Sequence, residues 1–300
     1  MTAHPHPQDL VSPVLGWYAA HARDLPWRRD GCSPWGILVS EVMLQQTPVG
    51  RVEPVWREWL ARWPEPADLA AEPPGEAVRA WGRLGYPRRA LRLHACAVAI
   101  TEQHAGEVPD TLGALRALPG VGAYTAAAVG AFAFGIRAAV VDTNIRRVQA
   151  RAVTGLAFPA PSLTAAETGL AERLLPADAE RAATWNVAVM ELGALVCTAR
   201  APRCDGCPIA QQCAWRLAGY PAYDGPARRG QAWHGTDRQC RGVVLGVLRE
   251  APGPVSLDQI AALWPDPEQL TRALEGLVSD GLAERVGDGE LQLPSGAGRT

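Results

Sequence analysis

Apolar residues recur with a helical period through most of this 300-residue chain. Between residues 10 and 215 they follow the helical repeat, proline and glycine interrupt them, and the alternation typical of strands is nearly absent. The pattern predicts helices at residues 34–47, 54–62, 74–84, 88–103, 111–118, 123–134, 143–154, 162–175 and 182–197. We therefore expect an all-α first domain.

A proline- and glycine-rich stretch at residues 219–235 separates this region from the C-terminal part. Beyond it, helical patterns at 238–250, 256–263 and 267–280 precede two short strand-like runs within 282–293. Three helices followed by a hairpin are the order of a winged helix. The sequence thus predicts a helical domain at 1–215, a linker at 216–236 and a small winged-helix-like α+β domain at 237–295.

The composition limits the available chemistry. All 29 basic residues are arginine, so no lysine amine can act as a nucleophile. The net charge of −2 gives no reason to expect or to exclude nucleic-acid binding, because arginines can gather on one face. No signal-like apolar run or membrane-spanning stretch is visible, and the cysteines outside one cluster show no pairing pattern. We expect a soluble, cytoplasmic protein that does not bind membranes.

The most specific chemical pattern is the spacing C-x6-C-x2-C-x5-C of Cys197, Cys204, Cys207 and Cys213. Four thiolates hold the corners of a cubane iron–sulfur cluster. A zinc ribbon would more naturally show two C-x2-C pairs about a dozen residues apart, and this segment has one such pair. The spacing favours a [4Fe-4S] cluster at residues 197–213 over zinc or four unrelated thiols.

A turn with two glycines, Gly120 and Gly122, joins two predicted helices in the segment LPGVGAYTA at residues 118–126. Glycines at a helix start let backbone N–H groups approach an anion closely, which suits a DNA phosphate. A simple interhelical turn is the alternative. Followed along the chain by the cysteine pattern, this turn resembles the helix–hairpin–helix and cluster loop of one superfamily of DNA glycosylases.

Further motifs resemble those of the adenine DNA glycosylases of the MutY family, in the same order along the chain. They are LPWR at 25–28, VSEVMLQQT at 39–47, WGRLGY at 81–86, VDTN at 141–144 and MELGALVC at 190–197. The resemblance covers roughly residues 10–215. It implies a two-lobed helix–hairpin–helix fold and a monomeric base excision repair enzyme. The implied substrate is double-stranded DNA in which adenine is mispaired with 8-oxoguanine or guanine.

Two carboxylic acids divide the expected chemistry. Glu41 lies in an apolar helix, where burial should raise its pKa; a buried glutamate that only bonds a helix end is the alternative. The resemblance implies that Glu41 protonates adenine at N7. Asp142 is placed to cap a helix, whose N–H donors should keep it ionised to stabilise a positively charged sugar. Asn144 resembles the family's residue that supports this carboxylate.

Tyr124 stands where bifunctional relatives carry a lysine that attacks the sugar. Because the chain has no lysine, we expect a monofunctional glycosylase that leaves an abasic site. Two other interpretations stay open. One is an oxidised-pyrimidine glycosylase and lyase, which Tyr124 opposes, and the other is a non-catalytic iron–sulfur protein that binds DNA or senses redox state.

The target base must leave the duplex, and the hole must be filled. Gln45, Gln46 and Tyr86 resemble the family's intercalating residues, although amides at a helix end are ordinarily just solvated. Two basic patches are either phosphate contacts or solvated helix faces: Arg88, Arg89 and Arg92, and Arg146, Arg147 and Arg151.

Three further residues are candidates for contact with the flipped adenine. Trp27 and Arg28 resemble residues that stack on the base and hydrogen-bond it; the alternatives are a core tryptophan and a surface cation. Glu191 resembles the family's adenine-reading carboxylate, and its alternative is a structural buried glutamate.

The C-terminal part departs from the family. Many members carry a long, mostly β domain that reads 8-oxoguanine, whereas the sequence here predicts a short winged helix. Its candidate recognition helix at 267–280 contains Glu268, Glu275 and Asp280 against Arg272 alone, and phosphate repels such a helix. We therefore expect this domain to pack against the chain or bind a protein partner rather than enter a DNA groove.

Overall fold

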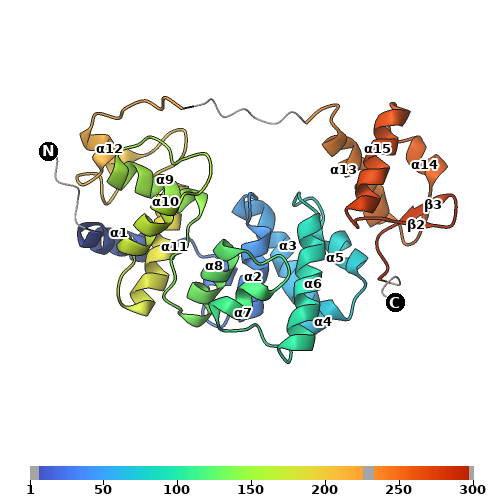
Figure 1. The fold of residues 1–300 in the computed structure, drawn as a ribbon, viewed down its shortest axis with the longest axis horizontal. Coiled ribbons are helices and arrows are strands. Elements are labelled where there is room, and N and C mark those ends of the chain that lie inside the picture. The colour runs from blue at the N-terminus through green and yellow to red at the C-terminus, as the bar shows by residue number, and fades with distance from the viewer. Residues whose placement is uncertain (1–6, 226–232, 297–300) are drawn as a thin grey trace. The chain divides into compact units, whose positions relative to one another are not determined.

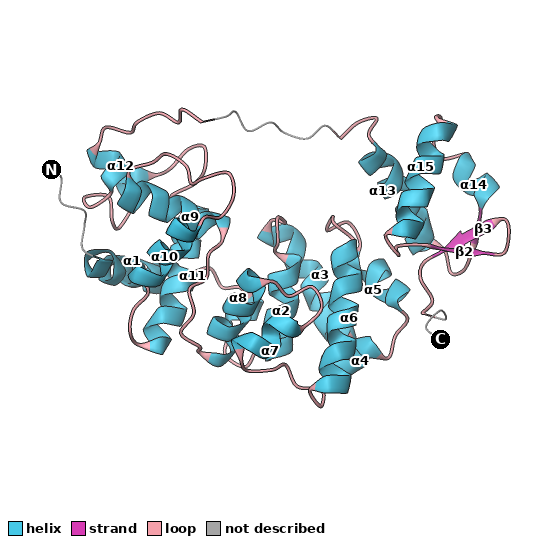
Figure 2. Ribbon diagram, viewed as in Figure 1, coloured by secondary structure: helices cyan, strands magenta, loops and turns pink. Residues whose placement is uncertain are grey.

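The computed structural model describes residues 7–225 and 233–296, and helices make up most of the regular structure in this part (Figure 1, Figure 2). The chain forms two compact units, each built from segments distant in sequence. The first unit contains the described residues of Met1–Pro34, Asp110–Arg116 and Gly122–Ala227. The second contains those of Trp35–Pro109, Ala117–Val121 and Arg228–Thr300. The expected combination of an all-α domain with a small α+β C-terminal domain is confirmed.

The first unit is organised around helix α11 (Ala179–Leu195), which the Asp178 side chain caps by accepting the N–H of Arg181 at 2.8 Å. Buried apolar residues of α11, such as Trp185 and Leu192, belong to one core cluster with residues of the neighbouring helices. The other helices are α1 (Pro7–His21), α7 (Leu112–Ala117), α8 (Ala123–Phe134), α9 (Thr143–Gln149), α10 (Ala165–Leu174) and α12 (Ala214–Leu217). Short 3-10 turns at Pro26–Arg28 and Cys204–Gly206 and a π-helix at Ala150–Thr154 complete the unit.

In the second unit, tryptophan side chains fill much of the core. Trp59 meets Trp63 and Trp81 edge to face, with ring centroids 4.9 and 5.7 Å apart. The indole N–H of Trp35 donates to the carbonyl of Trp63 at 3.1 Å. The helices around these rings are α2 (Pro34–Met43), α3 (Val49–Arg62), α4 (Pro66–Ala70), α5 (Pro74–Trp81) and α6 (Arg88–Gln103).

The C-terminal part of the second unit has the winged-helix order. Helix α13 (Asp237–Glu250) is followed by β1 (Val255–Ser256), α14 (Leu257–Ala261), α15 (Pro267–Ser279), β2 (Glu284–Val286) and β3 (Glu290–Gln292). The antiparallel sheet has the order β1-β3-β2, with Leu291 of β3 opposite both Val255 and Arg285. The hairpin is as predicted, whereas β1 was not predicted because two residues carry no readable alternation.

Other differences from the predicted elements have local causes. The helix predicted to reach residue 47 ends at Met43, because Pro48 disfavours helical geometry before it and the chain turns at Gln46, whose φ is 56°. The helix predicted at 143–154 changes to a π-helix at Ala150. The pattern missed α1, α4 and α12, and the latter two are too short for a periodic signal.

The tryptophan cluster should carry a measurable share of the stability. Replacing Trp59, which is 1% exposed, with alanine should cost about 3–5 kcal/mol through lost burial and a cavity. Trp233→Ala removes a ring that is 46% exposed and stacks under Arg238, so the loss should stay below about 1 kcal/mol. Urea unfolding followed by circular dichroism compares the two, and equal losses would contradict the role of the cluster.

Candidate active site

Glu41 lies in α2, within the second unit, and is 6% exposed. Every residue of this helix after Pro34 is buried, so the carboxyl group sits in a segment surrounded by protein. The expected burial of Glu41 is confirmed.

Asp142 caps α9 in the first unit. Its Oδ1 accepts the backbone N–H of Ile145 at 2.6 Å, and its Oδ2 accepts the side-chain amide of Asn144 at 2.7 Å. Both predictions, the cap and the support by Asn144, are confirmed as contacts. The hydrogen bonds from Ile145 and Asn144 act to lower the pKa of Asp142, as expected of a helix cap. Although part of the residue is exposed, burial of the carboxyl group raises the pKa of Asp142 despite these donors and the nearby charge of Arg147.

Asn144 is held in turn by Arg147. The Arg147 guanidinium donates to Asn144 Oδ1 at 2.8 Å, to the Gly193 carbonyl at 2.6 Å and to the Cys197 carbonyl at 2.7 Å. A Cβ on Gly193 would lie 2.7 Å from the Cβ of Asn144, so only glycine allows α11 to approach this close. The cap at Asp142 and the first cysteine of the cluster pattern are therefore joined through one guanidinium group.

Arg146 and Arg147, for which phosphate contact and a solvated helix face were both open, bond to the protein itself. Arg146 pairs with Glu167 at 2.7 Å and donates to the carbonyls of Ala160 and Ser162, and its side chain is only 10% exposed. The contacts of Arg147 are likewise with the protein itself. Sequence periodicity cannot distinguish an inward-facing arginine from an outward-facing one when its partners are distant in sequence.

Glu191 is fully buried and is held by Arg23 and Arg28. Arg23 donates to its carboxylate from Nε and Nη2, both at 2.7 Å, and from its backbone N–H at 3.1 Å; Arg28 adds a fourth bond at 3.1 Å. Burial acts to raise the pKa of Glu191, but the bonds from Arg23 and the charge of Arg28 outweigh it, and the net pKa is lowered. Four donors occupy the acceptor sites of a carboxylate, so direct reading of adenine by Glu191 is not supported.

The surroundings of Arg28 and Trp27 differ in what they leave available to the adenine. The Nη1 atom of Arg28 is buried and has no hydrogen-bond partner within residues 7–225 and 233–296, so it is available to an acceptor on a ligand. Trp27 is 6% exposed, which the core alternative explains. No local sequence pattern points to Arg23, which lies 168 residues from Glu191.

Gln45, Gln46 and Tyr86 lie on two turns of the second unit, and Arg89 links these turns. Its guanidinium stacks on the Tyr86 ring, 4.5 Å from the ring centroid, and donates to the Gln45 carbonyl. Gln46 and Tyr86 have φ values of 56° and 48°, which residues other than glycine rarely adopt. Tyr86 is 52% exposed. Arg89 was expected to bind phosphate, whereas here it fixes the turns.

The glycine turn borders this region within the second unit. Gly120 has a φ of 77°, and a Cβ there would lie 2.8 Å from the Cβ of Arg92, so the position requires glycine. One small surface pocket is lined in part by Gln45, Arg89, Arg92 and Gly120. Gly122 and Tyr124 belong to the first unit, where Gly122 precedes α8 and Tyr124 is half-buried against the core.

The four cysteines of the cluster pattern form one loop after α11. Burial and the neighbouring thiols raise the pKa of Cys207 to about 12, so thiolates there need positive charge, which iron supplies. Within the described residues, no three His, Cys, Asp or Glu side chains are arranged to hold a single metal ion. A cubane differs, since each thiolate binds its own corner. Arg151 donates to Cys197 Sγ at 3.4 Å and to the carbonyls of Thr198 and Ala199. These donors fit a [4Fe-4S] cluster.

Among the described residues, no helix is both long and apolar enough to cross a membrane.

Comparisons with known proteins agree with this site. Residues 39–169 match the HhH-GPD superfamily of base excision DNA repair proteins, and residues 197–213 match the iron–sulfur binding domain of endonuclease III. The chain is 54% identical over 283 residues to an adenine DNA glycosylase of Mycobacterium tuberculosis (strain CDC 1551), covering 94% of this chain and 92% of that protein. It is 53% identical to an adenine DNA glycosylase of Mycolicibacterium smegmatis, covering 97% and 98%.

A solved structure of a thermostable thymine-DNA glycosylase has the same fold. Its TM-score is 0.63 at 30% identity, over 71% of this chain and 97% of that one. The helical fold, the cysteine loop and the identity to the mycobacterial relatives all point to the same family. The chain belongs to the adenine DNA glycosylase (MutY) family of the HhH-GPD superfamily, and residues 197–213 are its [4Fe-4S] cluster-binding segment.

Proposed function

We propose that the protein is a monofunctional glycosylase that removes adenine mispaired with 8-oxoguanine or guanine and leaves an abasic site. One observation carries this proposal. Asp142 is a partly buried carboxyl group whose two oxygens accept hydrogen bonds from uncharged donors, the Ile145 N–H and the Asn144 amide. Its negative charge is therefore left for a cation that forms only during the reaction.

Glu41 would supply the proton. Burial favours the neutral form of a carboxyl group, which can then donate its proton to N7 of adenine. Breaking the C1′–N9 bond leaves its electron pair on the base and a positive charge on the sugar. Asp142 stabilises that charge in its ionised form, and water adds at C1′ and loses a proton. With no lysine in the chain and tyrosine at position 124, no lysine amine forms a covalent bond to the sugar.

Arg28 is the adenine contact that we favour. Its buried Nη1 has no partner in the described part of the chain, and Glu191 holds the rest of the guanidinium through Nη2. Glu191 thus positions Arg28 and does not itself read the base. The proposed substrate is duplex DNA, with Gln45, Gln46 and Tyr86 entering the gap left by the flipped adenine and the Gly120–Gly122 turn approaching a phosphate.

The remaining expectations belong to the same proposal. The protein acts as a monomer in the cytoplasm, in association with DNA. Its glycosylase domain spans residues 1–215, the linker 216–236 and the winged-helix-like domain 237–295; residues 1–6 and 226–232 of these ranges lie outside the described residues. The [4Fe-4S] cluster closes the loop between Cys197 and Cys213, and its bonds to the four thiolates are its contribution.

Base release from duplexes with adenine opposite 8-oxoguanine, guanine, cytosine or thymine tests the proposal. Glu41→Gln should slow adenine release about 100- to 10,000-fold, because it removes the proton donor without removing the side chain. Glu275→Gln, on an exposed face of α15, is the matched control and should release adenine at the parent rate. If the parent protein releases no adenine from any duplex, the proposed function is wrong.

The raised pKa of Asp142 has a consequence for stability. A carboxyl group whose pKa is higher in the folded than in the unfolded chain weakens the fold as pH rises through the folded pKa. Asp142→Asn removes this loss but also replaces one acceptor oxygen with an NH2 group facing the Asn144 amide, so at neutral pH the variant should be inactive with a change in stability below about 1 kcal/mol. Thermal unfolding at several pH values measures the difference. A variant that is markedly less stable at neutral pH would show that Asp142 is mainly a structural cap.

The same ionisation should shape the pH dependence of catalysis. Because Asp142 must be ionised while its pKa is raised, adenine release should decline on acidification at a higher pH than an ordinary aspartate would cause. Single-turnover rates between neutral and acidic pH measure this decline. A rate that stays constant down to the ordinary range of aspartate would contradict the role of Asp142.

A monofunctional enzyme forms no imine with the sugar. Incubation with mispaired duplex and borohydride should therefore give no covalent protein–DNA adduct, under conditions in which a lysine-bearing bifunctional glycosylase is trapped. A good yield of adduct from this lysine-free chain would contradict the mechanism.

A further inference from the structure

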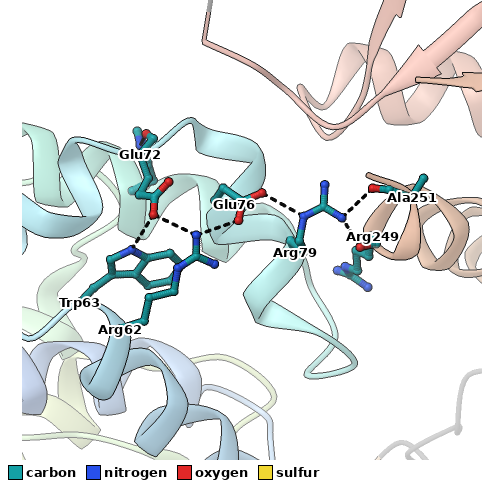
Figure 3. Close-up of polar contacts among 8 residues, drawn as sticks. Arg62, Trp63, Glu72, Glu76, Arg79, Arg249 and Ala251 are labelled. Atoms are coloured by element: carbon teal, nitrogen blue, oxygen red, sulfur yellow. Dashed lines mark hydrogen bonds and ion pairs between the residues drawn. The ribbon is translucent and has the colours of Figure 1, made fainter. Parts of the chain in front are cut away.

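Helices α5 and α13 of the second unit cap each other through two arginines, and Figure 3 shows the contacts of Arg79. Arg79 of α5 donates to the carbonyl of Arg249 and, at 2.9 Å, to that of Ala251. Arg249 of α13 donates from Nε to the carbonyl of Val78 at 2.9 Å. The last carbonyls of a helix lack partners within the helix, so each arginine satisfies groups that would otherwise need water. The winged-helix part is thus fixed to α5 by directional bonds.

The approach at this interface is close and specific. The Gly75 N–H donates to the carbonyl of Pro294 at 2.8 Å, and a Cβ on Gly75 would lie 2.6 Å from that oxygen. Burial lowers the pKa of Arg249 to about 10, because removing the guanidinium from water disfavours its charged form. Arg79 is also held by Glu76 at 2.9 Å, and Glu76 by Arg62 at 2.8 Å, so the network continues to α3 (Figure 3).

A second contact reaches the start of α6. Asp280, which ends α15, accepts a hydrogen bond from Arg88 at 2.8 Å and another from Arg241 of α13. Burial acts to raise the pKa of Asp280, but the bonds and charges of Arg241 and Arg88 outweigh it and lower the pKa. Arg88 is the first residue of α6 and stands two positions after Tyr86. The winged-helix part therefore holds the segment that follows the Tyr86 turn.

The Tyr86 turn needs such support. A φ of 48° at tyrosine costs of order 1–3 kcal/mol and persists only where the surroundings fix it. From one side Arg89 stacks on the Tyr86 ring and bonds the Gln45 carbonyl. From the other side Asp280 binds Arg88. Arg88 and Arg89 hold the beginning of α6, and with it the Tyr86 turn, between the turn that follows α2 and the winged-helix part.

We propose that the winged-helix part positions the Tyr86 turn and that Asp280, acting through Arg88, determines how sharply the enzyme distinguishes the base opposite adenine. This inference rests on the proposed function, in which Tyr86 enters the duplex beside that base. The acidity of α15 agrees with it, since Glu268 and Glu275 are exposed and would be repelled by phosphate. The domain acts on specificity through protein contacts rather than by touching DNA.

The test uses the full chain with its cluster and the variants Asp280→Asn, Asp280→Glu and Glu275→Gln. We measure kcat/KM for adenine release opposite 8-oxoguanine, guanine and cytosine. Asp280→Asn should lower the preference among these opposite bases about tenfold, which corresponds to losing about 1.4 kcal/mol of discrimination. Asp280→Glu should restore part of it, and Glu275→Gln should keep the parent preference. An unchanged preference, or an equal loss of rate on every duplex, would overturn the inference.

Amide hydrogen exchange gives a readout that does not depend on activity. Asp280→Asn should speed exchange across residues 84–90, while Glu275→Gln should leave it unchanged. If this segment exchanges no faster in Asp280→Asn, the winged-helix part does not hold the turn, and the inference fails. If exchange responds but the parent releases no adenine, the proposed function fails and the positioning contact remains.

Discussion

The contact of α9 with α11 at Gly193 is the constraint on which the candidate site depends. Only a glycine lets the two helices come so close, because a Cβ would overlap Asn144. At this point Arg147 binds Asn144 and the carbonyls of Gly193 and Cys197 at once. The orientation of Asp142 and the start of the cluster loop therefore follow from one packing contact. Loss of the close approach would disturb both together.

Because the chain has no lysine, arginine makes the buried ion pairs and caps the helix ends that need a cationic side chain. Arg23 grips Glu191 with two parallel bonds, Arg151 binds the cluster loop, and Arg79 and Arg249 cap helices. A planar guanidinium can satisfy several fixed acceptors at once, whereas an ammonium group offers a single charged point. This explains why Arg146 and Arg151, which the sequence placed in a basic patch, bond to backbone carbonyls within the protein.

The tension between burial and charge recurs at the carboxyl groups. Glu191 is buried with arginines and its pKa is lowered, whereas Asp142 is buried with uncharged donors and its pKa is raised. Hydrogen bonds from neutral groups do not repay the desolvation of a carboxylate as a direct ion pair does. Glu191 is thus neutralised by arginines and positions them, whereas the charge of Asp142 has no direct ion-pair partner among its hydrogen-bond donors and can stabilise a positive charge on the sugar.

Local patterns in the sequence determined most of the elements, and the motifs shared with a known family supplied most of the candidate residues. The helices at residues 88–103 and 123–134, the winged-helix order, the burial of Glu41 and the cap at Asp142 all follow from neighbours a few positions away. Only the tertiary structure decided which way the arginines point, that Arg23 and Arg28 together saturate Glu191, and that Asp280 reaches Arg88 across 192 positions. Periodicity reports the environment of a helix face, but an ion pair between distant segments depends on how the chain folds back, and no local pattern encodes that.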